Sequence, residues 1–318
     1  MSDVFVSVII VNYNSGVRLE KCLAHLTQQR FRDFDIVVVD NASSDRSHEV
    51  AEKTADVRVI NAGHNIGFAA ANNLAVKEAR GAWLAFLNPD AYAKEDWLEK
   101  FFEATKRYEG VDAFGSTQLD AADPAIVDGA GDVVHGIGLY YRGGLASSAT
   151  TLHEDGECFS PCAAAAFYKR EVFEALEGFD ERFFCYGEDV DLGFRLRHEG
   201  GRAIQLKDAV VLHEGSGITG RRSDFSIYHG VRNRLWVYYK NLPAQVFWLC
   251  LPVHLGVNLL MLTRSIFTGE GSAYWRGMRD GYAGMRTLKK TKVAQNSNAL
   301  RHLTWSPLKL LNRASDLR

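Results

Sequence analysis

Three carboxylates lie within four positions of the stretch FFCYGEDVDLGFRLRHEGG, which covers residues 183–201. They are Glu188, Asp189 and Asp191, and they follow directly on a run of aromatic residues. Like charges repel one another, so such crowding calls for either opposite charges or a chemical use. A carboxylate at the edge of a cleft can take a proton from a bound hydroxyl group, and this general-base chemistry is the use that the stretch suggests.

A helical projection separates the three carboxylates. The sequence predicts a helix that begins at Asp189 and ends before the glycine pair at 200–201. Asp189 and Arg197 fall on an apolar arc, whereas Asp191 falls on the opposite side. Asp191 and Arg195 have the i,i+4 spacing of a surface ion pair, which explains Asp191 without chemistry. The arc consists of Val190, Leu192, Phe194 and Leu196.

Asp189 has no comparable explanation. A carboxylate aimed into the protein from a first helical turn requires a hydrogen-bonding partner, a ligand or a raised pKa. Two interpretations stay open: a general base at the edge of a cleft, and a structural acceptor for neighbouring backbone N–H groups. Glu188 is expected to shape the turn, and the sequence assigns no role to Arg197.

A second group of polar residues suits a divalent cation. Asp90 and Asn88 end one predicted strand, and His213 ends a later one. A carboxylate and an imidazole are acceptable ligands for Mg²⁺ or Mn²⁺, which is typically shared with a diphosphate. Asn88 would then hold a water molecule or a ligand hydroxyl group. Taken singly, an aspartate in a turn and a lone histidine are more often structural, so the pair is a candidate.

Alternating strand and helix patterns position these residues. Strand-like runs within residues 4–91 alternate with helical spacing at 15–29, 45–55 and 67–79. This βαβαβαβ order predicts an α/β fold with a parallel sheet and helices on both faces. Ligands bind beyond the C-terminal ends of such strands, although turns favour Asn and Asp in any case. The residues at these ends are Asn12, Tyr13, Asn14, Asp40, Asn41, Asn61, Asn88, Pro89 and Asp90.

Composition limits the class of protein. The 318 residues are 47% hydrophobic and 24% charged, which is typical of a globular chain and excludes a disordered one. The five cysteines are odd in number and scattered, so we expect free thiols in a reducing cytoplasm. The N-terminus lacks the basic region of a signal peptide. Residues 119–160 are rich in Gly, Ala and Asp and are expected to form a loop-rich excursion.

The C-terminal part differs in character. Residues 241–263 contain no charged side chain, and the segment from Arg264 onward has eleven Lys/Arg against three Asp/Glu. The uncharged length approaches the roughly 20 residues that span a bilayer, yet polar residues and prolines interrupt it. Peripheral contact with an anionic membrane surface is favoured over a helical lid or dimer contact, and both over a true span. Nucleic-acid binding rests only on the basic tail and is not expected.

The motifs resemble a known family when they are taken in order. They are VSVIIVNYNSG, DIVVVDNASSD, NIGFAAANN, FLNPDA, GFDERFFCYGEDVDLGFRLRHEGG and VVLHEGS followed by RNRLWVYYKNLP. Over residues 4–243 the chain resembles family 2 inverting glycosyltransferases, most closely the bacterial rhamnosyltransferase-like branch. The resemblance implies a GT-A domain over 1–240, with a nucleotide-binding half at 1–118 and an acceptor-binding half at 119–240. A helical, amphipathic and basic region would follow over 241–318.

The resemblance also implies roles for single residues. Asp189 is similar to the family's catalytic base, Asp90 to the surviving metal-binding aspartate of its DxD motif, and His213 to the second protein ligand of the metal. Asp40 would contact the pyrimidine base, and Arg232 is a candidate contact to the diphosphate. The residues implied in nucleotide binding are Asn12, Tyr13, Asp40, Asn41, Asn65, Asn88 and Arg232.

Two positions depart from the family pattern. Asn88 replaces the first acid of DxD and removes one charge from the site. Ala163 and Ala164 stand where a Gly-Ala pair is usual, which leaves the acceptor contacts open.

The implied reaction is an inverting transfer from a nucleotide sugar, with Mg²⁺ or Mn²⁺ as cofactor. The expected donor is dTDP-rhamnose, and the expected acceptor is a polyprenyl-diphosphate-linked or cell-surface glycan at the inner face of the cell membrane. The alternatives are another donor, such as a UDP-hexose, and a non-catalytic protein that binds nucleotide sugars. The joint presence of Asp40, Asp90, Asp189 and His213 disfavours the non-catalytic alternative.

Overall fold

The computed structural model describes residues 4–152, 154–215, 220 and 222–318. A ten-stranded mixed sheet forms its centre, in the order β10-β12-β6-β11-β4-β1-β2-β3, with β5 beside β12 and β7 beside β6. The strands are β1 (Val6–Asn12), β2 (Phe34–Asp40), β3 (Val57–Asn61), β4 (Trp83–Leu87), β5 (Ala91–Ala93), β6 (Ala113–Asp120), β7 (Val127–Gly129), β8 (Asp132–Val134), β9 (Tyr140–Arg142), β10 (Gly156–Glu157), β11 (Ala165–Lys169) and β12 (Ala203–His213). The α-helices are α1 (Val17–Thr27), α2 (His48–Lys53), α3 (Gly67–Glu78), α4 (Trp97–Arg107), α5 (Arg170–Ala175), α6 (Glu188–His198), α7 (Asp224–Asn241), α8 (Ala244–Phe267), α9 (Gly271–Gly284), α10 (Ala299–His302) and α11 (Pro307–Asn312).

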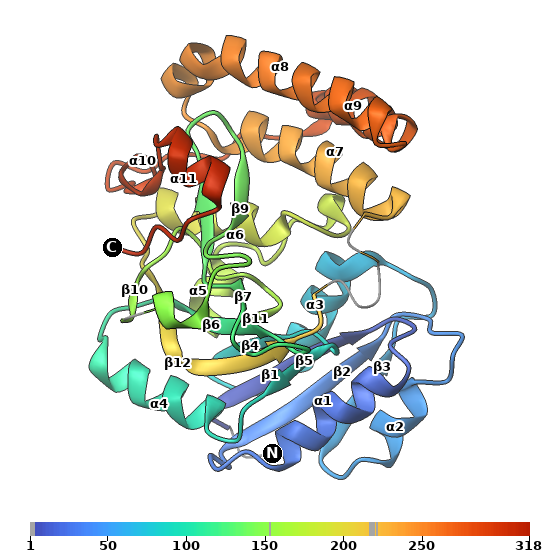
Figure 1. Ribbon diagram of the computed structural model, residues 1–318. Helices are drawn as coiled ribbons and strands as arrows, with labels where there is room; N and C mark the ends of the chain where they lie inside the picture. The colour runs from blue at the N-terminus through green and yellow to red at the C-terminus, as the bar shows by residue number, and fades with distance from the viewer. Residues whose placement is uncertain (1–3, 153, 216–219, 221) are drawn as a thin grey trace.

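The first four strands pair in parallel, as their alternation with helices predicts. β1 lies between β2 and β4, and β3 extends the sheet beyond β2. Residues of α1, α2 and α4 pack on one face of the sheet, and residues of α3, α5 and α6 pack on the other (Figure 1). Because both faces are covered, β1 is buried along its whole length, which explains its continuous apolar run. The predicted fold class is confirmed.

The middle of the chain is more regular than expected. The segment predicted to be loop-rich contains the short strands β7 to β10, and β8 pairs with β9 in a separate two-stranded sheet. β12 runs for 11 residues, with an irregularity between Leu206 and Val210. It ends at His213, as predicted, and lies between β6 and β10.

Three long helices form a layer above the sheet. α7 lies nearest to the sheet, and α8 and α9 lie farther out (Figure 1). A third core joins α6, α7 and α8 through Phe194, Trp236 and Phe247. The expected helical C-terminal extension is therefore present. The helix that packs directly against α6, which carries Asp189, is α7, just before that extension.

The basic tail returns to the body of the protein. Backbone hydrogen bonds join Thr291 to the end of α7, Thr304 to β8 and Arg318 to β10. The C-terminus consequently lies near β10 in Figure 1. The sequence suggested one amphipathic segment for this tail. The tail is instead divided into α9, α10 and α11, and its backbone groups pair with residues of β8, β10 and α7.

Candidate active site

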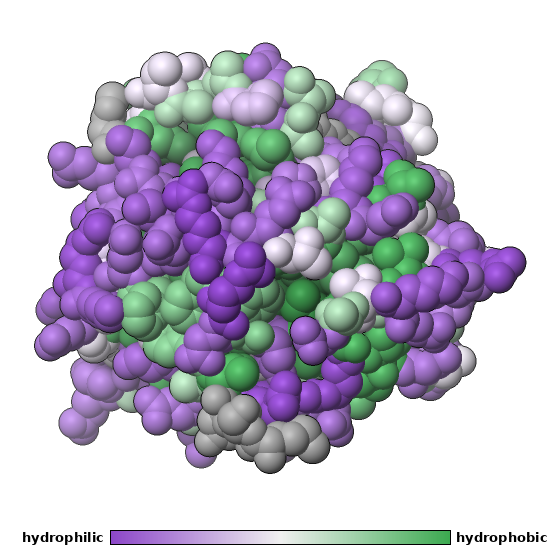
Figure 2. All heavy atoms as spheres, turned by 90° about the horizontal axis from the view of Figure 1, so that it is seen from below, coloured by the Kyte–Doolittle hydropathy of each residue, from purple (hydrophilic) through white to green (hydrophobic). Residues whose placement is uncertain are grey.

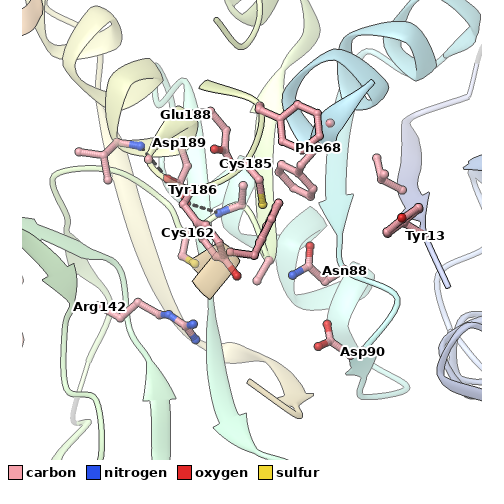
Figure 3. A pocket seen from close by; sticks show the side chains of 18 of the residues that line it. Tyr13, Phe68, Asn88, Asp90, Arg142, Cys162, Cys185, Tyr186, Glu188 and Asp189 are labelled. Atoms are coloured by element: carbon pink, nitrogen blue, oxygen red, sulfur yellow. Dashed lines mark hydrogen bonds between the residues drawn. The ribbon is translucent and has the colours of Figure 1, made fainter. Parts of the chain in front are cut away.

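A cavity of about 680 Å³ opens beyond the C-terminal ends of the central strands. Its volume lies within the range of ordinary small-molecule sites. Figure 3 shows Asp189 and Glu188 on one side of it and Asn88 and Asp90 on another, all facing the same space. The predicted site residues that line it are Tyr13, Asn41, Asn65, Asn88, Asp90, Asp189 and His213. The structure therefore brings together the candidate base and the candidate metal pair.

Asp189 lies in the first turn of α6, which begins one residue earlier than predicted. Its two carboxylate oxygens accept hydrogen bonds from the backbone N–H groups of Ala163, at 3.2 Å, and Val190, at 2.9 Å. Burial raises the pKa of Asp189, and these N–H groups together with the charge of Arg142 offset part of that rise. The interpretation of Asp189 as an acceptor for backbone N–H groups is confirmed. The same carboxylate faces the cavity, so the general base stays a prediction that this geometry permits.

Two further carboxyl groups lie beside Asp189. Glu188 is buried and lines the cavity, a position that the sequence did not predict for it. Asp132, from β8, is also buried and accepts a hydrogen bond from Ser160 Oγ at 3.1 Å. Burial, with the negative charge of Asp189 as the next cause, raises the pKa values of Glu188 and Asp132 well above their ordinary range. The cluster therefore favours a single negative charge, and Asp189, with two N–H donors, is best placed to carry it.

The prediction of a surface ion pair at Asp191 is wrong. Its bond to Arg195 is present at 2.9 Å, but the Asp191 side chain is completely buried. Lys240 and Asn241, at the end of α7, each donate a further hydrogen bond to it at 2.8 Å. Asp191 thus ties α6 to α7 in the interior. Arg197 is also fully buried and donates to backbone carbonyls, among them those of Phe159 and Gly201.

Asp90 and His213 have the arrangement of two neighbouring ligands of one cation. Asp90 Oδ1 lies 3.4 Å from His213 Nε2. His213 Nδ1 lies 2.7 Å from Asp128 Oδ2, and since a carboxylate accepts, Nδ1 carries the proton and Nε2 is turned towards Asp90. Burial lowers the pKa of His213, and the bonds to Asp128 and Asp90 raise it, with a net rise.

The donor set fits Mg²⁺ or Mn²⁺ bound together with a ligand. Across the described residues, no group of three or more His, Cys, Asp and Glu side chains is placed to hold a metal ion. The protein would thus supply Asp90 and His213, and a diphosphate with water would complete the coordination. Hard oxygen ligands with one imidazole suit these two ions.

Asparagines form the edge of the cavity beside α3. Asn41 Nδ2 donates to Asn65 Oδ1 at 3.0 Å, and Asn65 Oδ1 also accepts from the N–H of Gly67 at the start of α3. Asn12 and Asp40 are buried and bonded to each other at 2.9 Å, and they are not among the described residues that line the cavity. Their hydrogen bond lies in the interior behind this edge of the cavity. The predicted position was a direct contact to a nucleoside.

The family follows from comparison with known proteins. The model of "Glycosyl transferase family 2" matches residues 7–176, more than half of the chain. The chain belongs to glycosyl transferase family 2. The family and the enzyme class predicted from the motifs are therefore confirmed, and the protein is a glycosyltransferase.

One curated relative and two solved structures illustrate the similarity. The chain is 28% identical over 253 residues to the "N-acetylglucosaminyl-diphospho-decaprenol L-rhamnosyltransferase" of Mycobacterium tuberculosis, covering 70% of this chain and 79% of the relative. The mannosyltransferase PcManGT of Pyrobaculum calidifontis, in complex with GDP-Man and Mn²⁺, aligns with a TM-score of 0.56 and 18% identity, covering 90% and 87% of the two chains. TarS of S. aureus (1-349), in complex with UDP, aligns with a TM-score of 0.53 and 19% identity, covering 79% and 70%. The structural neighbours show a common GT-A fold.

One predicted nucleotide contact of this glycosyltransferase is placed elsewhere. Arg232 lies outside the described lining of the cavity, and its guanidinium lies over the Trp236 ring, 4.4 Å from the ring centroid. It donates to the carbonyl of Phe183 at 2.7 Å. Arg232 therefore binds the loop before α6, which does not fit the predicted contact to a diphosphate.

Arg142, at the end of β9, is the arginine that the cavity contains instead. Figure 3 shows its guanidinium pointing into the cavity, and it also pairs with Asp128. Sequence reasoning missed Arg142, Asp128 and Asp132. All three belong to short strands between residues 119 and 160, where no periodic pattern marks which side chains face inward.

Proposed function

We propose that the protein is an inverting glycosyltransferase that transfers rhamnose from dTDP-rhamnose to a polyprenyl-diphosphate-linked or cell-surface glycan acceptor. The observation that carries the proposal is one cavity that has Asp189 on one side and the Asp90–His213 pair on another. Burial raises the pKa of Asp189. The printed name of the mycobacterial relative supports the sugar and the acceptor class.

Asp189 is proposed as the general base. Its carboxylate takes the proton of the acceptor hydroxyl group while that oxygen bonds to the anomeric carbon of the donor. The bond from this carbon to the diphosphate oxygen breaks on the opposite face, and its electron pair leaves with the nucleoside diphosphate. One displacement inverts the anomeric configuration without a covalent intermediate on the enzyme. General-base assistance of this kind contributes roughly 10²–10⁴-fold.

Asp90 and His213 are proposed to hold Mg²⁺ or Mn²⁺. When bound, the cation supplies positive charge that stabilises the diphosphate leaving group. Asn88 lies beside Asp90 at the end of β4 and lines the same cavity, where its amide can hold a water molecule or a donor hydroxyl group. Asp128 fixes the orientation of His213 through the bond to Nδ1.

Part of the cavity lining is apolar, which supports a 6-deoxysugar as donor. Apolar contacts suit the methyl group of rhamnose better than a hydroxymethyl group, by about 10²-fold at most. The apolar and aromatic residues concerned are Phe68, Phe184, Tyr186, Val190 and Phe225.

Nucleotide binding tests the donor half of this proposal. Titration calorimetry with dTDP, UDP and GDP is expected to show the tightest binding for dTDP, and Mn²⁺ should tighten it by about tenfold or more, which corresponds to 1.4 kcal/mol. Asp90→Asn should remove the dependence on Mn²⁺. Asp123→Asn, which changes an exposed aspartate in a loop away from the cavity, is the matched control and should retain it. Equal affinity of the unaltered protein with and without Mn²⁺ would contradict the metal site.

We further propose that the protein contacts the inner face of the cell membrane through α8. This helix is long and apolar enough to cross a membrane. Its buried side includes polar residues, however: His254 Nδ1 bonds to the carbonyl of Ile137 at 2.8 Å, and Asn258 accepts a hydrogen bond from Arg234 at 2.8 Å. A helix that packs one polar side on its own protein is better suited to lie along a surface than to cross it.

The opposite side of α8 is uncharged and exposed. We call this side the exposed α8 face, and it consists of Trp248, Leu249, Val253, Leu255, Leu259, Leu260, Ile266 and Phe267. At about 100° per residue these side chains occupy an arc of about 160°. Figure 2 shows the molecule from the side opposite to α8 and α9, where hydrophilic side chains cover much of the surface with apolar ones between them. A continuous apolar side of this length is unusual on a free protein surface and suits a lipid surface.

Vesicle binding tests this second proposal. The protein is expected to sediment with vesicles of equimolar phosphatidylcholine and phosphatidylglycerol, and the double variant Leu249→Glu, Leu260→Glu should stay in the supernatant. Val17→Glu changes an equally exposed apolar residue on α1 and should sediment like the unaltered protein. A dimer in lipid-free solution that the double variant abolishes would instead show that the exposed α8 face is a contact between two copies.

A further inference from the structure

The loop that carries Asp189 has an unusual backbone. Residues 183–187 connect the short helix η2 (Glu181–Phe183) to α6. Within it, Phe184 has a φ of 65°, Tyr186 a φ of 73° and Gly187 a φ of 81°. Residues other than glycine adopt positive φ at a cost of about 1 kcal/mol or more each, so such a loop persists only where its surroundings hold it.

One buried amide on α7 holds this loop. Asn233 is completely buried, and its Nδ2 lies within hydrogen-bond distance of three loop carbonyl oxygens. These are the oxygens of Phe183, Cys185 and Tyr186, at 2.9, 2.8 and 2.6 Å. Arg232 Nε donates to Asn233 Oδ1 at 2.8 Å, which turns the NH₂ group of the amide towards the loop. Arg232 also donates to the carbonyl of Phe183, so both residues serve the same segment.

The other side of the loop contacts the edge of the cavity beside α3. The carbonyl of Phe184 accepts a hydrogen bond from the N–H of Ala69 in α3 at 3.2 Å. The Phe184 ring packs so closely against Gly67 that a Cβ atom there would lie 2.5 Å from it. Gly67 in turn donates to Asn65. The loop is thus fixed between α3 and α7, and α6 with Asp189 begins at its end.

We propose that Asn233 is a positioning residue that sets the place of the Asp189 carboxylate in the cavity. This inference rests on the proposed role of Asp189 as general base. Asn233 does not line the cavity as far as the structure describes it, so it acts through the loop and not on the substrate. A displacement of about 1 Å in a reacting group can cost about 10²-fold in rate. Without its three bonds to the amide, the loop can shift by that amount while the helices around it stay packed.

The test replaces the amide and measures rate, binding and local opening. Asn233→Ala and Asn233→Asp, the second of which keeps the shape of the side chain but removes its N–H donors, are expected to lower kcat by about 10- to 100-fold. The KM for dTDP-rhamnose and the calorimetric Kd for dTDP should change less than threefold. Hydrogen exchange of the amides at 183–190 should accelerate. Asn258→Ala is the matched control, because Asn258 is equally buried, bonds to the carbonyl of His254 on α8 and does not contact the loop.

Three results would overturn the proposal. The first is a kcat within threefold of the unaltered protein in both Asn233 variants, and the second is unchanged exchange at 183–190. An equal loss of kcat in Asn258→Ala would also overturn it, since general destabilisation would then explain the effect. Failure of the proposed function has a different signature: no transfer from dTDP-rhamnose by the unaltered protein, with exchange at 183–190 still faster in the Asn233 variants.

Discussion

Replacing Asp189 by asparagine is expected to lower turnover by about 10²–10⁴-fold and to leave nucleotide binding intact. The asparagine has the same shape, and its carbonyl oxygen can still accept a hydrogen bond from the N–H of Ala163 or Val190. It cannot accept the proton of the acceptor hydroxyl group. The comparison requires kcat with dTDP-rhamnose and the proposed polyprenyl-diphosphate-linked acceptor, together with the calorimetric Kd for dTDP.

Neighbouring carboxyl groups provide the control for this variant. Glu188→Gln changes a side chain whose pKa is already raised well above its ordinary range, so it removes no charge that the mechanism uses. Its loss of turnover should be clearly smaller than that of Asp189→Asn. Near-normal turnover of purified Asp189→Asn, or a larger loss in Glu188→Gln, would assign the base to another carboxyl group.

The pH dependence of kcat should report the same group. A general base works when it is deprotonated, so turnover falls as the pH drops through the pKa of Asp189 in the complex. Because burial raises that pKa, the fall should begin at a higher pH than an ordinary aspartate, with a pKa of about 3.9, would give. Asp189→Asn should lack this acid limb.

The parts of the fold that the sequence predicted well are those with local patterns. The continuous apolar runs of β1 and β2 and the helical spacing of α1 arise from burial on both sides of one parallel sheet. The polar strand ends at Asn88 and Asp90 could be placed at the ligand edge for the same reason, because parallel strands end together. The helical projection of α6 correctly turned Asp189 and Arg197 inward.

The same projection failed for Asp191, because residues far away in the sequence determine whether its side chain is buried. It placed Asp191 on the surface because Arg195 alone explained its charge, but Lys240 and Asn241 approach from α7, about 50 residues later in the sequence. A projection records the direction of a side chain and not which element covers it. Asn12 shows the opposite error. It ends a strand and was predicted to contact a ligand, but its side-chain amide donates hydrogen bonds to Asp40 and Ser47 inside the protein.

The cavity wall opposite the first strands could not be predicted. Asp132 and Arg142 line this wall, and Asp128 pairs with Arg142 and His213. All three belong to strands of three residues each, which are too short to show alternation. Strands of this length are stabilised by their partners and not by their own propensity. Their inward directions therefore depend on pairings such as that of β7 with β6, which are not visible in the local sequence.

Replacing Asp191 by alanine is expected to lower the free energy of unfolding by about 3–5 kcal/mol, the usual cost of breaking a buried ion pair by removing one partner. Asp191 is 0% exposed and accepts hydrogen bonds from Arg195, Lys240 and Asn241. Lys240 keeps its bond to Asp180 at 2.7 Å, so part of its charge stays compensated. Urea unfolding followed by tryptophan fluorescence would measure the change.

The helix α5 contains a matched pair for comparison. Arg170 and Glu174 have the same i,i+4 spacing and a similar separation, 2.8 Å against 2.9 Å for Arg195 and Asp191, but Glu174 is 53% exposed. Glu174→Ala should therefore lower the free energy of unfolding by less than about 0.5 kcal/mol, because exposed ion pairs contribute little. Equal losses in the two variants would mean that Asp191 behaves as a surface charge after all. A large loss confined to Asp191→Ala, partly restored by adding Lys240→Met, would show that Asp191 joins α6 to α7 through a buried ion pair.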